Sequence, residues 1–195
     1  MNKKSDWSYP EPRTGLFGQW DKFVGPGATL TEQMISLVPA VFAALCITYY
    51  SYVSNLGWSL MQHIVAAIIA FDIVGGITTN ATSSAKRWYH RSGQTAINHL
   101  GFVSIHILQI FLVSWLFRNL DIPYIIGVYL YLLFAASGIL YVPLRIQRSV
   151  ALLLVCGAIL ISEYVYSPTP GFEWFIPLLF IKLLVSHLTM EEPYM

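Results

Sequence analysis

The strongest constraint on the fold of this chain is a series of six apolar runs, each of about 20 residues. A run of that length crosses a bilayer as an α-helix, because a helix satisfies its own backbone hydrogen bonds where water is absent. Only 11% of the residues are charged, against about 25% in ordinary soluble domains. The predicted spans are Met34–Val53, Gly57–Thr79, Ala96–Phe117, Pro123–Tyr141, Val150–Tyr166 and Phe172–Leu188.

We therefore predict an all-α, polytopic integral membrane protein built as a bundle of six transmembrane helices. Residues 34–190 form this domain, and residues 191–195 form a short C-terminal tail. Thr29 and Glu32 have the spacing of a capping box at the start of the first span. Residues 1–33 carry aromatic side chains among charges, which is typical of a segment lying against lipid headgroups; an arm that docks on a partner is the alternative.

Lysine and arginine are unevenly distributed among the connections and indicate the orientation. They occur in the N-terminal segment and in the second and fourth connections, whereas the third connection has only Arg118 and the first and fifth have none. The positive-inside rule then places both termini in the cytoplasm. We expect a multi-pass protein of a bacterial-type inner membrane, with the lipid bilayer as its surroundings and no nucleic acid partner.

Asp72 is the clearest anomaly, because it lies inside the second apolar run. A charged group in hydrocarbon costs at least about 2.5–3.5 kcal/mol, so such a group usually faces the bundle interior and has a partner. Counting 1.5 Å per residue places Asp72, His99, His106 and Lys182 in one layer of the cytoplasmic half. We predict a site in which Asp72 and His106 act as acid/base or ligand residues and His99 orients them. The alternatives are a packing ion pair between Asp72 and Lys182, and neutral histidines bonded across helices.

The connection "NATSSAKRWYHR" follows this span and combines amide, hydroxyl and cationic groups. Such groups at a cytoplasmic interface suit the anionic end of a lipid or a phosphate group. They also suit a positive-inside anchor that binds nothing. The predicted ligand-binding residues are Asn80, Lys86, Arg87, His90, Arg91 and Lys182.

Carboxylate and imidazole ligands suit Zn²⁺ or Fe²⁺, so Asp72 and His106 are also candidate metal ligands. His99 and His106 are about 10.5 Å apart along a helix, too far to bind one ion together. Haem is not expected, because His63 lies in the outer half and on the face opposite Asp72. Cys46 and Cys156 lie in apolar runs and are predicted to be buried thiols without a disulfide.

The segments "RWYHR" and "EWFIPLLFIKLLVSHLTMEEPY" resemble a group of bacterial six-span inner-membrane proteins. That resemblance implies a fold and a location but no activity. From the residues we expect a small membrane enzyme or ligand-binding protein for a lipid-like or quinone-like molecule. A non-catalytic subunit of a larger membrane complex and a proton-coupled transporter or channel are the alternatives, and a homo-oligomer is compatible with each.

Overall fold

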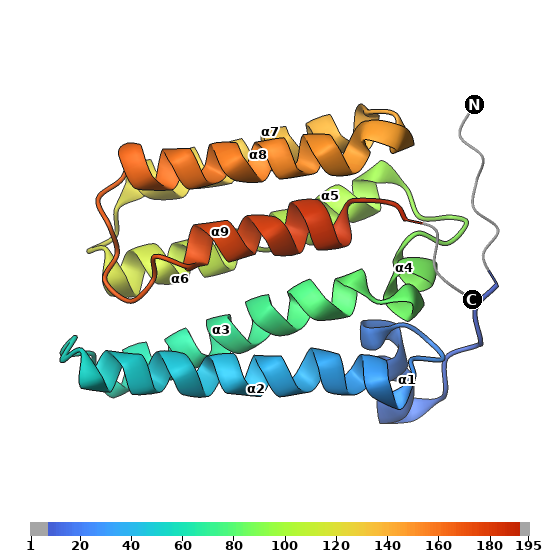
Figure 1. Cartoon of the computed structure of the whole chain (residues 1–195), viewed down its shortest axis with the longest axis horizontal. Helices are drawn as coiled ribbons and strands as arrows, with labels where there is room; N and C mark the ends of the chain where they lie inside the picture. Colours follow the sequence, from blue (N-terminus) through green and yellow to red (C-terminus); the bar gives the residue numbers. More distant parts are fainter. Residues whose placement is uncertain (1–7, 192–195) are drawn as a thin grey trace.

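The computed structural model describes residues 8–191, and this part of the chain is helical and contains no strand. The all-α prediction is therefore confirmed. Figure 1 shows the long helices lying side by side along one axis. In chain order the elements are α1 (Gly15–Val24), α2 (Leu30–Val53), α3 (Leu60–Ala81), α4 (Ser83–Tyr89), α5 (Ala96–Ser104), α6 (Ile107–Phe117), α7 (Ile122–Tyr141), α8 (Leu144–Tyr164), α9 (Phe175–Phe180) and the π-helix η1 (Ile181–His187).

Five helical segments are long and apolar enough to cross a membrane: α2, α3, the pair α5–α6, α7 and α8. They contain 20 to 24 residues and have mean hydropathies of at least 1.7. The sixth predicted span corresponds to α9 and η1, which form a shorter apolar helix, Phe175–His187. The first span begins at Leu30 rather than Met34, because its capping box extends the helix to the cap residue. The structure thus supports a helical membrane protein with five spans by length and composition.

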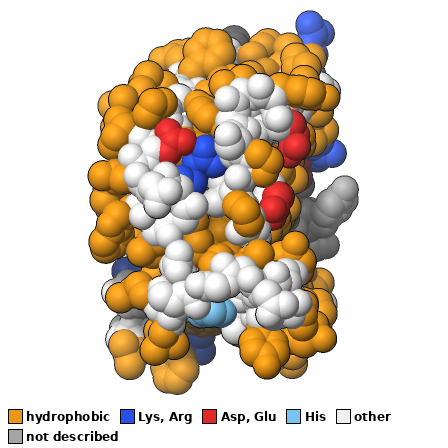
Figure 2. Space-filling view, turned by 90° about the vertical axis from the view of Figure 1, so that its left-hand side faces the viewer, with side chains coloured by type: hydrophobic (Ala, Val, Ile, Leu, Met, Phe, Trp, Pro, Cys, Tyr) orange, Lys and Arg blue, Asp and Glu red, His pale blue; other side chains and the backbone are white. Residues whose placement is uncertain are grey.

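The bundle has two chemically different ends (Figure 1). We call one the α4 end: it holds α1, α4, the end of η1 and the α7–α8 turn. The other, which we call the far end, holds the α2–α3, α6–α7 and α8–α9 connections. Figure 2 views the far end, where hydrophobic side chains surround a few charged groups. Among the described residues, the cationic part of the N-terminal segment and the second and fourth connections lie at the α4 end, and Arg118 lies at the far end. Lys3 and Lys4 lie outside the described residues.

Local sequence signals account for how several helices begin and pack. The side chain of Thr29 accepts from the Glu32 backbone, and the Glu32 carboxylate accepts from the Thr29 backbone, so the predicted capping box is confirmed. Gly75 lets α2 approach α3, since a Cβ there would lie 3.1 Å from the Cβ of Ala40. The two cysteines are wrongly predicted as buried: Cys46 and Cys156 are both free and exposed on helix surfaces, where lipid rather than water accommodates an apolar thiol.

Two helices depart from regular α geometry. The third span is interrupted between Ser104 and Ile107, although no proline occurs there. The last helix continues as a π-helix over Ile181–His187. Such interruptions are frequent at functional sites, and His106 and Lys182 lie within these two segments.

Candidate functional site

An ion pair between α3 and η1 forms the centre of the candidate site. The Nζ of Lys182 lies 2.5 Å from the Oδ2 of Asp72. The amide nitrogen of Gln109, on α6, donates to the same carboxylate oxygen. The Lys182 side chain is 3% exposed and that of Asp72 is 40% exposed. The ion pair that we gave as an alternative to an acid/base site is therefore present, and together with Gln109 it links three separate helical segments.

Gly76 explains how a lysine reaches an acid on a neighbouring helix. A Cβ at this position would lie 2.3 Å from Cε of Lys182 and 3.1 Å from its Nζ. No real Cβ tolerates that separation, so any other residue would displace the lysine stem. The glycine of "FDIVGG" thus makes room for the cation beside Asp72.

The ion pair borders a cavity of about 350 Å³, which we call the groove. Its apolar side chains are Phe23, Phe102, Ile105 and Leu108, contributed by α1 and the α5–α6 segment. Its polar side chains come from α3, α4, α6, η1 and the α5–α6 interruption: Asp72, Thr79, Asn80, Tyr89, His106, Gln109 and Lys182. We call the polar residues of this lining the groove floor and the apolar residues the groove wall.

Two polar atoms on this floor have no hydrogen-bond partner: the Oε1 of Gln109 and the Nδ2 of Asn80. Buried polar atoms are nearly always paired, so an unpaired acceptor and an unpaired donor in one groove indicate a site for a polar group. His106 adds a third group, because its Nδ1 donates to the Phe102 carbonyl at 2.9 Å. Its Nε2 is then an acceptor.

His99 does not join Asp72 and His106 but belongs to a second group, which we call the histidine cluster: His90, His99 and His187. The Nδ1 of His99 lies 3.2 Å from the Nε2 of His187. The His90 ring stacks on His99 with centroids 4.8 Å apart, and its Nε2 donates to the His187 carbonyl at 2.9 Å. His187 was missed as a site residue. Its position at the C-terminal end of the last apolar run, level with His99, was the signal available.

The cations of the α3–α5 connection are directed away from the groove. The ammonium of Lys86 donates to the carbonyls of Ser186 and Thr189, each at 2.6 Å, and so caps the end of η1. Burial lowers the pKa of Lys86 to about 8. The guanidinium of Arg91 lies 3.7 Å from the centre of the Trp88 ring.

Of the predicted ligand-binding residues, Asn80 and Lys182 line the groove, whereas Lys86, Arg87, His90 and Arg91 do not. Arg87 donates to the Ser84 hydroxyl at 3.4 Å, and its Nε is buried without a partner. The predicted cationic grip on an anionic end is therefore not assembled around Asp72.

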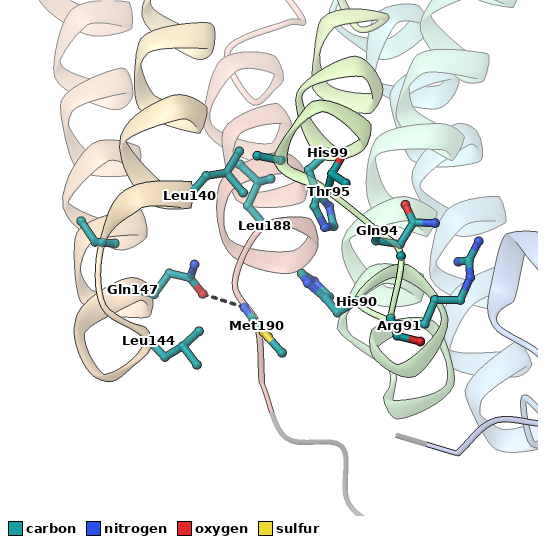
Figure 3. A pocket seen from close by; sticks show the side chains of 14 residues that line it. His90, Arg91, Gln94, Thr95, His99, Leu140, Leu144, Gln147, Leu188 and Met190 are labelled. Carbon is teal, nitrogen blue, oxygen red and sulfur yellow. Dashed lines mark hydrogen bonds between the residues drawn. The ribbon is translucent and has the colours of Figure 1, made fainter. Parts of the chain in front are cut away.

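Some of these residues instead border a pocket of about 250 Å³ at the α4 end, which we call the end pocket (Figure 3). His90, Arg91 and His99 come from one side, and Gln147 of α8 approaches the Met190 backbone on the other. Burial lowers the pKa of His90 to about 3, so its ring is neutral.

The prediction of a metal ion at Asp72 and His106 gains no support. Within residues 8–191, no group of three His, Cys, Asp or Glu side chains is placed to hold a metal ion. The Asp72 carboxylate is already engaged by Lys182 and Gln109. The chemistry available in the groove is that of a carboxylate, an ammonium, an imidazole and two amides, which suits hydrogen bonding and proton transfer.

No family model, no curated protein and no solved structure matches this chain.

Proposed function

We propose that this protein is a six-span inner-membrane protein that binds a neutral, amphipathic, lipid-like or quinone-like molecule in the groove. The 13 residues of Phe175–His187 extend about 20 Å as a regular helix, so residues before α9 complete the sixth crossing. The α4 end carries nearly all the loop cations and therefore faces the cytoplasm, with both termini on that side. The groove then lies in the cytoplasmic half of the membrane.

The observation that carries the proposal is the unpaired polar pair on the groove floor. Gln109 offers an acceptor and Asn80 a donor, each without a partner. Asp72 and Lys182 compensate each other's charge, so the floor favours a head group that is neutral and carries both a hydroxyl and a carbonyl or a similar donor–acceptor set. A phosphate would find no free cation among these groove residues. Quinones, quinols and lipid alcohols or acylglycerols fit this description.

The groove walls support the same proposal. Phe102, Ile105 and Leu108 contribute apolar surface from the α5–α6 segment, and this suits the tail of the same molecule. Asp72 is half-exposed although α3 is an apolar span, so a ligand dissolved in the bilayer reaches its carboxylate from the side. If the protein catalyses a reaction, Asp72 and His106 are the groups that exchange protons with the ligand.

A second candidate function is proton-coupled transport. The observation that favours it is the interruption of the third span beside His106, with the π-helix at Lys182 opposite. Interrupted helices near the membrane midplane hold substrates in several transporter folds. Flux of a co-purified ligand across a liposome membrane would favour this candidate, whereas binding without flux favours the first. A subunit of a larger complex would co-purify with a stable partner.

The test is identification of molecules that co-purify with the protein extracted in its native lipid. Mass spectrometry of the extract should find one amphiphile enriched over the bulk membrane composition. Gln109→Leu should lower its occupancy at least tenfold, because the change removes the free acceptor and the bond to Asp72. The control is Thr78→Val: its hydroxyl donates to carbonyls of its own helix and does not line the groove. Extracts without an enriched amphiphile, or equal occupancy in both variants, would contradict the proposal.

A further inference from the structure

We propose that His99 and His187 form a proton relay that connects the end pocket with the groove. The inference rests on the proposed function in one respect: the relay supplies the route by which protons reach the groups that contact the ligand. The observation behind the inference is the direct hydrogen bond between two buried imidazoles.

The relay begins at the α4 end. His99 lines the end pocket, where Figure 3 shows its ring beside Thr95 and above His90. From there its Nδ1 reaches the Nε2 of His187 at 3.2 Å. Imidazole is the side chain that both accepts and donates a proton near neutral pH through two different nitrogens. The bond therefore passes a proton from the ring of His99 at the end pocket to the ring of His187 on the neighbouring helix.

One ring nitrogen of His187 is free to form a further hydrogen bond. The residue is 3% exposed, and its Nδ1 has no hydrogen-bond partner. A buried polar atom without a partner costs about 1–3 kcal/mol. His187 also lines a cavity of about 250 Å³, which we call the inner cavity, together with Tyr89, Asn98 and Phe102. That space is large enough for water, and its polar lining can hold it.

The inner cavity adjoins the groove. Tyr89 and Phe102 line both of them. The Phe102 ring packs between two histidines, with centroids 4.2 Å from His187 and 5.1 Å from His106. The inner cavity thus shares His99 with the end pocket and shares Tyr89 and Phe102 with the groove, and the Phe102 ring separates His187 from His106.

The proton balance of the relay is simple. A proton binds Nε2 of His99, and the proton on its Nδ1 passes to Nε2 of His187. The proton on Nδ1 of His187 then leaves to water in the inner cavity and continues to His106. One proton enters, one leaves, and exchange of the ring tautomers restores the start.

Other titratable groups surround the two rings. Lys86 and His90 come from the α4 region, and His106 comes from the α5–α6 interruption. Tyr89 packs edge-on against His187 with a centroid distance of 5.6 Å, and Arg91 borders both the end pocket and the inner cavity.

The experiment is solid-state NMR of the [¹⁵N]histidine protein in bilayers. The readout is the exchange rate of the His106 ring proton with bulk water. His187→Phe should slow this exchange at least tenfold, because phenyl fills the same volume without ring nitrogens. His63→Phe is the control: this ring lies near the far end, where it bonds the Ser59 carbonyl at 2.9 Å, and the exchange rate should not change.

Further readouts keep the proposal falsifiable. His99→Gln should slow exchange in the same way if His187→Phe does not fold. In the wild-type protein, Nδ1 of His187 should correlate with water protons. Unchanged exchange in a folded variant, or no water correlation in the wild type, would overturn the relay. Neither measurement needs a bound amphiphile, so failure of the relay and failure of the ligand proposal are separate results.

Discussion

Two ion-paired clusters, one around Arg118 and one around Lys182, differ in whether their polar atoms are satisfied. At the far end, the Arg118 guanidinium donates to Asp121, to the Ser167 carbonyl at 2.7 Å and to the Thr169 hydroxyl at 2.6 Å. It also lies 4.2 Å from the Tyr124 ring centre. We call this cluster the staple, because it fastens the α6–α7 connection to the segment before α9.

The cluster in the groove has a similar pair of charges but a different outcome. Asp72 and Lys182 are bonded to each other, yet Gln109 and Asn80 beside them each keep an atom unpaired. A cluster whose every strong donor and acceptor is used has no capacity left for a ligand. From this comparison we infer that a charged residue inside a helical bundle indicates a ligand site only when polar atoms around it lack hydrogen-bond partners.

The largest expected effect is on the staple. Arg118→Met leaves Oδ2 of Asp121 and the Ser167 carbonyl without their donor, although Oδ1 of Asp121 still accepts from the Tyr124 backbone. The free energy of unfolding should therefore fall by about 3 kcal/mol. Unfolding in detergent, followed by far-ultraviolet circular dichroism, measures it. The matched control is Arg145→Met: this side chain is exposed, and its loss should change stability by less than about 0.5 kcal/mol. Equal effects of the two changes would remove the distinction between the clusters.

The next effect concerns the fit of Lys182 against α3. Gly76→Ala places a Cβ where Cε of Lys182 lies, and such overpacking costs about 1–3 kcal/mol. The same change at Gly101 meets no atom within 4 Å, so it should stabilise its helix by about 0.5–1 kcal/mol. Opposite signs of the two changes in the same unfolding assay are expected. A stabilising Gly76→Ala would mean that the lysine does not occupy this position.

Lys86 is a third buried cation, and it differs from Arg118 and Lys182 because it donates to backbone carbonyls and not to a carboxylate. Burial lowers its pKa in the folded state to about 8 from an ordinary 10.5, so above pH 8 the unfolded chain binds more protons. Stability should therefore rise between pH 8 and 10, by at most about 1.4 kcal/mol per pH unit. Above pH 10 the raised pKa of Tyr89, about 12, acts in the opposite direction. Unfolding curves at several pH values test this, and Lys86→Met should abolish the rise; a rise that persists would assign it to another group.

The level of each polar side chain along the bundle was predictable from the sequence, whereas the direction in which it points around its helix was not. Counting residues at a fixed rise placed Asp72 and Lys182 at one level, and a charged pair at one level has a strong reason to meet. His99 lies at a suitable level too, but it turns toward His187 and not toward Asp72. The interruption before Ile107 and the π-helix change the azimuth of each following residue. No proline marks the interruption, and Pro177, four residues before the π-helix, does not specify a change of helix type.

The cationic connection shows a second limit of the sequence. We treated this connection as a loop and therefore predicted that its side chains face a ligand. Instead, α4 packs against the last helix, and Lys86 donates to the carbonyls at the end of that helix. The need to satisfy those carbonyls arises only once the chain is packed. The sequence therefore predicted where the polar residues gather, but not which of them would remain unpaired.

The smallest expected change in stability gives the sharpest test of the comparison. The double variant Asp72→Asn, Lys182→Met removes both charges of the groove at once. Replacing a whole buried ion pair by uncharged side chains of similar size is often neutral, so stability should stay within about 1 kcal/mol of the wild type. Occupancy of the co-purified amphiphile should nevertheless fall at least tenfold, because the carboxylate that accepts the hydrogen bond of Gln109 and so orients its amide is gone.

The equivalent double variant at the far end, Arg118→Met with Asp121→Asn, should behave in the reverse manner. It loses stability, because the Ser167 carbonyl and the Thr169 hydroxyl lose their donor as well, and it keeps the amphiphile. Mass spectrometry and unfolding of both double variants measure the two effects together. If the groove variant unfolded as readily as the far-end variant and still held its amphiphile, the groove cluster would be a second staple and the ligand would bind elsewhere.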